Sequence, residues 1–293
     1  MKTAFITGSA TGIGHATCNR LLKEGWRVFA GHLDGETLDP AWKNNPNITT
    51  ISCDVTNPTQ IADAAALVSD MTHCSIDLLF NNAGYADTCG VLEAVNMADY
   101  RRHFDINFFG PLNVIQSFAP LVKQAKGRVI NTTSASVYMT IPLSSAYPVS
   151  KIALKALTYH FRMEMKPFGV EVTSLEPGGV KTNMTNLDTN RIDTAWKSIP
   201  ERLRAEYQKH FLDGVTAIGD NFAMCHPDEF ADEIYTKVIC AKKLKAYYLL
   251  GPGVSIMPWL HRLLPAQTVL NIWTKMFTPK KVKAKNARDS ITA

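Results

Sequence analysis

The chain opens with Met1-Lys2-Thr3-Ala4-Phe5-Ile6-Thr7-Gly8-Ser9-Ala10-Thr11-Gly12-Ile13-Gly14, and this stretch decides its fold. Residues 1–7 form a short apolar run that is typical of a buried strand, and an apolar helical pattern follows the glycines until Gly25. Glycines between a strand and a helix allow a tight turn and let backbone N–H groups approach a pyrophosphate at the helix N-terminus. The stretch therefore predicts a dinucleotide-binding turn, although its G-x-x-x-G-x-G spacing departs from the G-x-G-x-x-G fingerprint.

Strand-like and helix-like segments alternate from this turn to about residue 250. Strand-like runs occur at 26–31, 48–53, 76–80, 127–133, 169–175 and 245–250. Helical patterns occur at 57–70, 97–125, 146–166 and 227–242. Such alternation with short turns predicts a doubly wound α/β fold, in which a parallel sheet has helices on both faces. In this architecture ligands bind at the carboxyl ends of the strands.

Composition narrows the class of protein. The chain has 293 residues, 46% of them hydrophobic and 19% charged, which suits one large globular domain. Its six cysteines form no C-x-x-C pair and its histidines show no metal-binding spacing, so neither a disulfide framework nor a metal site is expected. With no uninterrupted apolar run of about 18 residues and no targeting segment before the first strand, a cytoplasmic protein is expected.

The formal net charge of +5 comes entirely from the end of the chain. From Lys275 onward the sequence holds six basic residues and one acid, which leaves residues 1–274 formally neutral. A neutral body gives no sign of nucleic-acid binding.

A second informative segment is Tyr147-Pro148-Val149-Ser150-Lys151, with Ser134 thirteen residues before Tyr147 and Asn107 farther upstream. Tyr147 and Lys151 are one helical turn apart and can project from the same face. A free tyrosine ionises near pH ~10, and a nearby ammonium lowers that pKa towards the range where a phenol acts as a general acid/base. Ser134 would hold a substrate oxygen against the phenol. Taken alone, however, Y-x-x-x-K also describes two solvated side chains on a helix.

Four motifs occur together in one order: the glycine turn, Asn81-Asn82-Ala83-Gly84, the spaced set around Tyr147, and Pro177-Gly178-Gly179-Val180-Lys181-Thr182. In this combination the chain resembles the short-chain dehydrogenase/reductase family over roughly residues 1–250, nearest to its retinol and hydroxysteroid dehydrogenase branch. The resemblance implies a Rossmann-type fold and an NAD(P)-dependent oxidoreductase that interconverts an alcohol and a ketone or aldehyde. It also implies a small apolar substrate, such as a steroid, a retinoid or an acyl-like compound.

Carried over to matching positions, the family's catalytic residues are Asn107, Ser134, Tyr147 and Lys151. Tyr147 would be the acid/base, and Ser134 would orient and polarise the substrate oxygen. Lys151 would lower the tyrosine pKa and bind the nicotinamide ribose. Asn107 would hold a water that links Lys151 to solvent; the alternative is a helix residue with a local hydrogen bond. The protein would then supply orientation and a proton to a hydride transfer that belongs to the cofactor.

The resemblance likewise implies cofactor contacts from Gly8, Gly12, Ile13, Gly14, Asp34, Asp54, Asn82, Ala83, Lys151 and Thr182. The three glycines would shape the pyrophosphate turn, with a backbone N–H from Ile13. Asp54 would contact the adenine; the alternative is an N-cap-like acid before the helix at 57. Asn82 and Ala83 would line the cofactor, and Thr182 would meet its carboxamide.

The choice between NAD and NADP depends on the second strand. Where NAD-preferring members of the family place an acid, this chain has His32, and the nearest acid is Asp34. NADP-preferring members place arginine or lysine just after that position or before the second motif glycine, where this chain has Leu33 and Thr11. NAD is therefore favoured over NADP, with Asp34 repelling a 2′-phosphate.

Two segments extend the alternating pattern. The expected organisation is a catalytic Rossmann domain over 1–253, with a substrate-covering region at 183–225, followed by a C-terminal helical extension and basic tail over 254–293. The aromatic residues of 183–225 suggest an apolar pocket roof or a packed helical flap. The extension suggests helices packed on the body or on a sister subunit, with a membrane-surface segment as the less favoured alternative.

Two functions of different classes stay open. One is the oxidoreductase, and the other is a non-catalytic dinucleotide-binding sensor or scaffold. Retention of the whole set around Tyr147 favours the enzyme. The resemblance also implies a homodimer or homotetramer through the helices at 97–125 and 146–166.

Overall fold

The computed structural model describes residues 1–87, 90–185, 197, 199–207 and 223–277. Within this part of the chain, one seven-stranded sheet has the order β3-β2-β1-β4-β5-β6-β7, and every neighbouring pair is parallel. Its strands are β1 (Thr3–Ile6), β2 (Arg27–His32), β3 (Ile48–Ser52), β4 (Leu78–Asn81), β5 (Arg128–Thr132), β6 (Glu171–Pro177) and β7 (Tyr247–Leu250). The chain starts in the middle of the sheet, builds one side and then the other, which confirms the predicted doubly wound fold.

Helices connect the strands and extend beyond them. The described α-helices are α1 (Gly12–Lys23), α2 (Pro58–Thr72), α3 (Met97–Phe104), α4 (Gly110–Ala125), α5 (Ala146–Met165), α7 (Glu201–Tyr207), α9 (Pro227–Glu233), α10 (Met257–Leu263) and α11 (Ala266–Phe277). Single 3-10 turns are η1 (Pro40–Trp42), η2 (Leu92–Ala94), η4 (Ala135–Tyr138) and η5 (Lys166–Phe168). Two π-helical turns, η3 (Asp105–Phe109) and η7 (Ile234–Ile239), follow α3 and α9.

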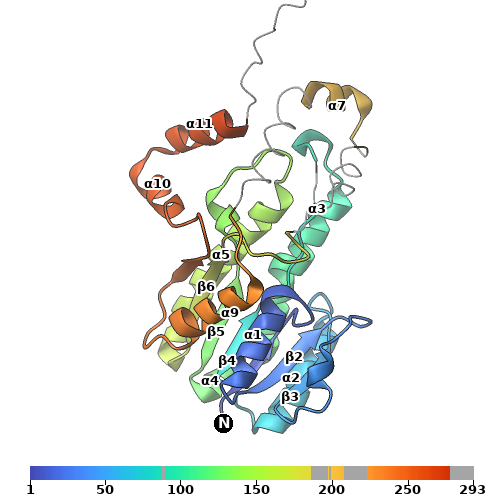
Figure 1. Ribbon diagram of the computed structural model, residues 1–293, viewed down its shortest axis with the longest axis vertical. Coiled ribbons are helices and arrows are strands. Elements are labelled where there is room, and N and C mark those ends of the chain that lie inside the picture. Colours follow the sequence, from blue (N-terminus) through green and yellow to red (C-terminus); the bar gives the residue numbers. More distant parts are fainter. Residues whose placement is uncertain (88–89, 186–196, 198, 208–222, 278–293) are drawn as a thin grey trace, which may run out of the picture.

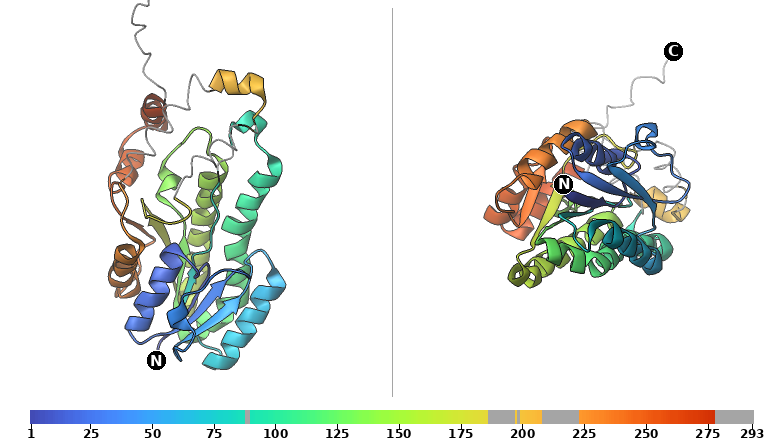
Figure 2. Two further views of the ribbon diagram at one scale, coloured as in Figure 1. Left: turned by 45° about the vertical axis from the view of Figure 1, so that its right-hand side comes forward. Right: turned by 90° about the horizontal axis from the view of Figure 1, so that it is seen from below.

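Two helical layers cover the sheet. Helices α1 and α9 lie on one face, and α2, α4 and α5 lie on the other (Figures 1 and 2). Because side chains alternate along a strand, Ile6 and Val28 face the first layer while Phe5 and Phe29 face the second. Phe5 stacks on Phe118 of α4, with ring centroids 4.2 Å apart. The centre of the sheet is therefore a rigid platform for the loops at its carboxyl edge.

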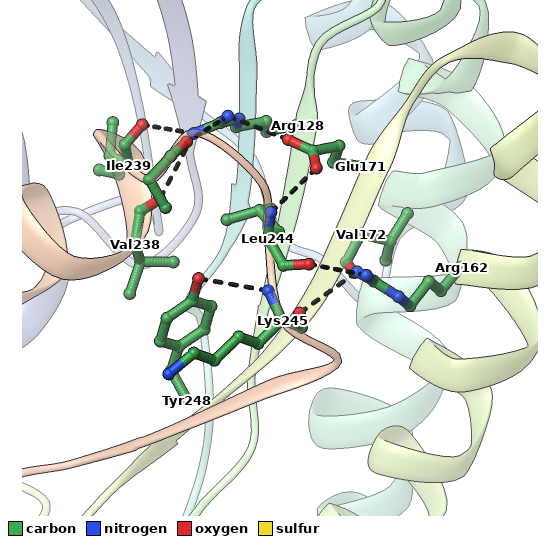
Figure 3. A network of polar contacts seen from close by, with 10 residues as sticks. Arg128, Arg162, Glu171, Val172, Val238, Ile239, Leu244, Lys245 and Tyr248 are labelled. Carbon is green, nitrogen blue, oxygen red and sulfur yellow. Dashed lines mark hydrogen bonds and ion pairs between the residues drawn. The ribbon is translucent and has the colours of Figure 1, made fainter.

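Two arginines attach the outer edge of the sheet to the body (Figure 3). Arg128 at the start of β5 pairs with Glu171 at 2.9 Å and donates to the Ile239 carbonyl at 2.6 Å. Arg162 of α5 donates to the Leu244 carbonyl at 2.7 Å. These bonds satisfy carbonyl groups at the end of η7 and in the turn before β7, where no helix or strand partner exists.

The predicted helix at 97–125 is confirmed as one continuous run, but it carries a π-helical turn in its middle. The sequence pattern did not show this turn, because one extra residue barely changes the apolar period. It contains Asn107, one of the predicted site residues.

The extension folds back on the body. Val254, Met257, Val269 and Trp273 are buried in one cluster with Ala135 of η4. Among the described residues, no helix has both the length and the apolar character needed to cross a bilayer. The extension and α7 lie beyond the carboxyl edge of the sheet (Figure 1).

The predicted substrate-covering region is described only in part. Ile199 and Leu203 of that region pack against Val91, and Tyr207 donates to Glu93 at 2.8 Å. The remainder, with Trp196, Phe211 and Phe222, lies outside the described residues.

Candidate active site

The turn after β1 is built from close backbone contacts. Gly8 and Gly12 have φ angles of +63° and +59°, which side-chain-bearing residues rarely adopt. A Cβ on Gly14 would lie 2.2 Å from the Gly8 carbonyl oxygen, and a Cβ on Gly8 would lie 2.8 Å from the Ala83 Cα. Only glycine fits at these positions.

The first turn of α1 faces this same region with uncapped backbone groups. The N-cap residue, Thr11, makes no side-chain hydrogen bond to the helix, although threonine is able to make one. The N–H groups in the first turn of α1, which include that of Ile13, thus have no side-chain acceptor at the cap. Such a helix N-terminus suits an anionic group.

The motif after β4 closes the turn. The Asn82 side chain donates to the carbonyl oxygens of Thr7 and Gly8 at 3.2 and 3.1 Å. The backbone N–H groups of Asn82 and Ala83 both donate to the Thr7 hydroxyl at 3.0 Å. Asn82 therefore shapes the glycine turn from behind. Thr182 completes the ring of contacts, since a Cβ on Gly12 would lie 3.1 Å from its methyl group.

Asn107 is bound to the loop that follows this motif. Its side chain accepts from the Tyr85 N–H and donates to the Tyr85 carbonyl, both at 2.8 Å, and it also donates to the Ser150 hydroxyl at 3.0 Å. The alternative of a local helical hydrogen bond is wrong, because Tyr85 is 22 residues away. Asn107 lies within the π-helical turn η3, a kind of irregularity that is frequent at functional sites.

Lys151 lies beside Asn107 in the interior. Its side chain is only 2% exposed, and its ammonium donates to the Thr132 carbonyl at 2.9 Å. A Cβ on Gly84 would lie 3.3 Å from the Lys151 Nζ and 3.4 Å from the Asn107 Oδ1, so both groups border this glycine. Since Gly84 follows Ala83, the lysine and the glycine turn adjoin.

Tyr147 and Ser134 complete the group. The Lys151 Nζ is 5.7 Å from the centroid of the Tyr147 ring. The Ser134 side chain hydrogen-bonds the Tyr147 phenol, and its oxygen also accepts from the Ser136 N–H at 3.1 Å. The four predicted catalytic residues are thus brought to one place from η3, the turn after β5, and α5.

The electrostatics differ from the sequence expectation. Burial raises the pKa of the Tyr147 phenol, and the hydrogen bond with Ser134 only partly opposes this. Burial also lowers the pKa of the Lys151 ammonium to about 7. Within the described residues no carboxylate pairs with Lys151. The expectation weighed the lysine charge but not the desolvation of both groups.

The acids predicted to bind the cofactor lie farther along the same edge. Asp34 is exposed after β2 and accepts from the Gly35 N–H at 3.1 Å. Asp54 follows β3 and accepts from the Thr56 N–H at 2.8 Å. Its alternative role as the helix cap is wrong, because the Asn57 side chain caps α2. Among the described residues, no hydrogen bond or ion pair joins Asp34 or Asp54 to the residues around Lys151.

Sequence reasoning missed two contributors. Glu36 accepts from the Leu33 N–H at 2.8 Å and so adds a second carboxylate to the loop after β2. Gly84, which the sequence analysis named only as part of a motif, borders the ends of both the Lys151 and the Asn107 side chains. Among the described residues, no group of three or more potential metal ligands gathers anywhere.

Comparison with known proteins agrees with this geometry. The family model for short chain dehydrogenases matches residues 2–192. Human 17-beta-hydroxysteroid dehydrogenase type 2 is 30% identical over 275 residues, which cover 90% of this chain and 70% of that protein. Mouse retinol dehydrogenase 5 is 32% identical over 71% of this chain and 67% of its own length.

A solved structure shows the same fold. The short chain dehydrogenase from Burkholderia cenocepacia J2315, in complex with NADP, matches with a TM-score of 0.70 and 25% identity. The match covers 95% of this chain and 100% of that one. This chain therefore belongs to the short-chain dehydrogenase family, in the branch with hydroxysteroid and retinol dehydrogenases, and is an oxidoreductase acting on CH–OH groups.

Proposed function

We propose that this protein interconverts a secondary or primary alcohol and the corresponding ketone or aldehyde by hydride transfer, with Tyr147 as the acid/base. One observation carries the proposal. A group of four side chains lies beside a glycine turn in which backbone packs closely against backbone; the four are Tyr147, Ser134, Lys151 and Asn107. Such an arrangement supports a site in which Tyr147 would donate a proton beside a bound dinucleotide.

The residues at the glycine turn fit a nicotinamide dinucleotide. Gly8, Gly12 and Gly14 keep side-chain atoms out of the turn, and the uncapped start of α1 suits a pyrophosphate. Lys151 would bind the nicotinamide ribose, and Ala83 and Thr182 would line the neighbouring part of the cofactor. When bound, the cofactor supplies or accepts the hydride.

The protein's own groups handle the proton. In carbonyl reduction, the Tyr147 hydroxyl donates its proton to the carbonyl oxygen, and in alcohol oxidation the phenolate accepts it from the hydroxyl. The Ser134 hydroxyl holds the substrate oxygen next to the phenol. Lys151 supplies a positive charge that favours the phenolate, and Asn107 fixes the loop at Gly84 against which the lysine lies.

An apolar substrate is the best-supported class. The names of the relatives refer to a hydroxysteroid and to retinol, both largely apolar alcohols. The described part of the proposed substrate-covering region contributes Ile199 and Leu203 to a small buried apolar cluster with Val91. On the ground of these relatives, the proposed substrate is a steroid, a retinoid or an acyl-like compound.

NAD is the proposed cofactor in preference to NADP. The loop after β2 presents two carboxylates, Asp34 and Glu36, and both repel a 2′-phosphate. The Burkholderia relative was solved with NADP, so the fold accommodates that dinucleotide in a relative. Titration with NADH and NADPH decides between them for this chain.

A homodimer or homotetramer formed through α4 and α5 is the proposed assembly. A groove of about 360 Å³ lies between these helices, lined by Leu112, Ile115, Ala119, Leu157, His160 and Phe161.

A cytoplasmic location is proposed for this protein, with attachment to a membrane surface as the alternative.

A turnover screen tests the proposal. Purified protein is assayed with steroid, retinoid and hydroxyacyl alcohols and with simple alcohols, each with NAD and with NADP, and the Tyr147→Phe variant serves as control. We expect turnover of at least one apolar alcohol by the wild-type protein alone. Tight dinucleotide binding without turnover of any substrate would instead support the non-catalytic sensor.

A further inference from the structure

A second lysine on α5 belongs to a buried ion pair. Lys155 lies one helical turn after Lys151, and its ammonium is 2.8 Å from the Glu176 carboxylate. The Glu176 side chain is 0% exposed and lies on β6 directly before Pro177. Because burying one charge without its partner is costly, Lys155 and Glu176 must stay together in the folded protein.

Tyr138 joins this pair from the turn that carries Ser134. The Tyr138 hydroxyl donates to the Glu176 carboxylate at 2.8 Å and accepts from the Lys155 ammonium at 2.7 Å. Burial, followed by the Glu176 charge, raises the pKa of the Tyr138 phenol far above its usual range. Tyr138 therefore stays a neutral hydroxyl and is unsuited to acid/base chemistry, although it lies beside a lysine as Tyr147 does.

A second branch leads from Glu176 back to the neighbour of Ser134. The Ser174 hydroxyl donates to the Glu176 carboxylate at 3.3 Å, and it is hydrogen-bonded to the Thr133 hydroxyl at 2.8 Å. Thr133 also donates its N–H to the Leu175 carbonyl at 2.7 Å. The network thus fixes the residue just before Ser134 as well as the turn after it.

The turn between these two anchors is a single 3-10 turn. Ser134 caps it by accepting from the Ser136 N–H, and Tyr138 ends it. The Tyr138 backbone is held too, because its carbonyl oxygen accepts from His261 of α10 at 2.7 Å, if that ring nitrogen carries the proton. Both ends of the Ser134 turn are therefore fixed by side chains that do not reach the Tyr147 phenol.

We propose that Tyr138 is a positioning residue, which acts through the Lys155–Glu176 pair to hold the Ser134 hydroxyl against the Tyr147 phenol. This inference rests on the proposed function of Ser134 and Tyr147. Rate depends steeply on such placement, since an error of about 1 Å can cost 10²-fold. A buried, fully paired network is stiff enough to set that placement.

The test compares Tyr138→Phe with Tyr159→Phe. Tyr159 is also on α5, with Lys155 6.0 Å from its ring centroid, but no hydrogen bond among the described residues links its side chain to the Ser134 turn. Each variant thus removes one phenolic hydroxyl from a tyrosine that lies near Lys155. We expect Tyr138→Phe to lower kcat by about 10- to 100-fold, with the Kd for NADH within about twofold of wild type. Tyr159→Phe should keep both values.

Equal kcat values for the two variants would overturn the proposal. So would a fall in kcat of Tyr138→Phe that is matched by an equal loss of NADH affinity, because that result indicates general damage rather than positioning.

Hydrogen exchange separates this inference from the proposed function. Peptides that cover residues 134–139 should exchange faster in Tyr138→Phe than in Tyr159→Phe, whatever substrate the enzyme uses. If the wild-type protein turns over no substrate, the proposed function fails, while this comparison still decides whether Tyr138 holds the turn. Identical exchange in the two variants would show that it does not.

Discussion

The two halves of the proposed site at the carboxyl edge of the sheet are built from different kinds of groups. In the nucleotide half, formed by the segments after β1 and β4, backbone lies against backbone, as where a Cβ on Gly14 would reach to 2.2 Å from the Gly8 carbonyl. The chemistry half is formed by the segments after β5 and β6 together with α5. It consists of buried ionisable side chains. Lys151 and Glu176 are both in the interior there.

This difference separates two kinds of sensitivity. A site made of backbone groups depends on space, so it fails when an atom is added and responds little to pH. A site made of buried ionisable side chains depends on protonation, because burial has lowered the pKa of Lys151 to about 7. The following changes break one half at a time.

The largest effect is expected from Tyr147→Phe, which breaks only the chemistry half. It removes the proposed proton donor and leaves the glycine turn untouched, so turnover should fall by ~10²–10⁴-fold. NADH affinity, measured by fluorescence titration, should stay close to wild type. Near wild-type turnover in the purified variant would show that Tyr147 is not the acid/base.

The next effect concerns the stability of the cofactor-free protein and the charge of Lys151. Burial lowers the pKa of this amine from 10.5 to about 7. Below about pH 7 the amine is charged in both states, so the folded state bears the full cost of burying the charge. Between about 7 and 10.5 only the unfolded chain keeps the proton, and the free energy of unfolding therefore rises with pH.

Lys151→Met removes this charge and should raise the free energy of unfolding near pH 7 by a few kcal/mol more than near pH 10. Denaturant unfolding of the variant and the wild type at both pH values measures the difference. Lys242→Met, at an exposed lysine, is the matched control. An advantage of Lys151→Met that is the same at both pH values would contradict the buried charge.

The two halves also differ in how far sequence predicts them. The strand predicted at 127–133 is β5 at Arg128–Thr132, and the strand predicted at 169–175 is β6 at Glu171–Pro177. Glycine spacing indicates the nucleotide half because backbone geometry restricts which residue fits. Even there, the sequence did not show that the Asn82 side chain donates hydrogen bonds to the Thr7 and Gly8 carbonyls.

The chemistry half is harder to predict, since its properties depend on residues far apart in the chain. Nothing local in Glu176 or Lys155 shows that the two side chains meet in the interior. The expectation that Lys151 lowers the Tyr147 pKa was incomplete for the same reason, because desolvation depends on every element packed around the pair. The π-helical turn that presents Asn107 is likewise absent from the apolar pattern.

A smaller effect is expected when the nucleotide half is given a different charge. Leu33→Arg combined with Asp34→Ser replaces a repulsive carboxylate with a cation at the loop after β2. The ratio of the Kd values for NADPH and NADH should then shift towards NADPH by about tenfold, or roughly 1.4 kcal/mol. Glu36→Gln, which removes the other carboxylate, should give a shift in the same direction. Tighter binding of NADPH than NADH by the unmodified protein would overturn the assignment of NAD.

The smallest effect is expected for binding of the C-terminal extension to a lipid surface. One side of α10 and α11 is buried on the body through Met257, Val269 and Trp273. On the other side, Trp259 is 57% exposed and Leu263 is 72% exposed. Lysines at 280, 281, 283 and 285 follow in the sequence. An exposed apolar side next to basic residues favours an anionic lipid surface, at about 1 kcal/mol per basic residue.

The membrane-surface alternative predicts weak, salt-sensitive sedimentation of the full chain with anionic liposomes and none with neutral ones. The favoured packing role predicts that the full chain stays in the supernatant with both. Changing Lys280, Lys281, Lys283 and Lys285 to Gln should abolish such sedimentation without altering turnover, since none of the residues assigned to either half of the site is changed. A Trp259→Ser variant should weaken it as well if the aromatic side chain enters the headgroup region. If the full chain and the glutamine variant both stay in the supernatant with either liposome, the extension has only a packing role. In that case its contact with Tyr138 through His261 is its link to the chemistry half.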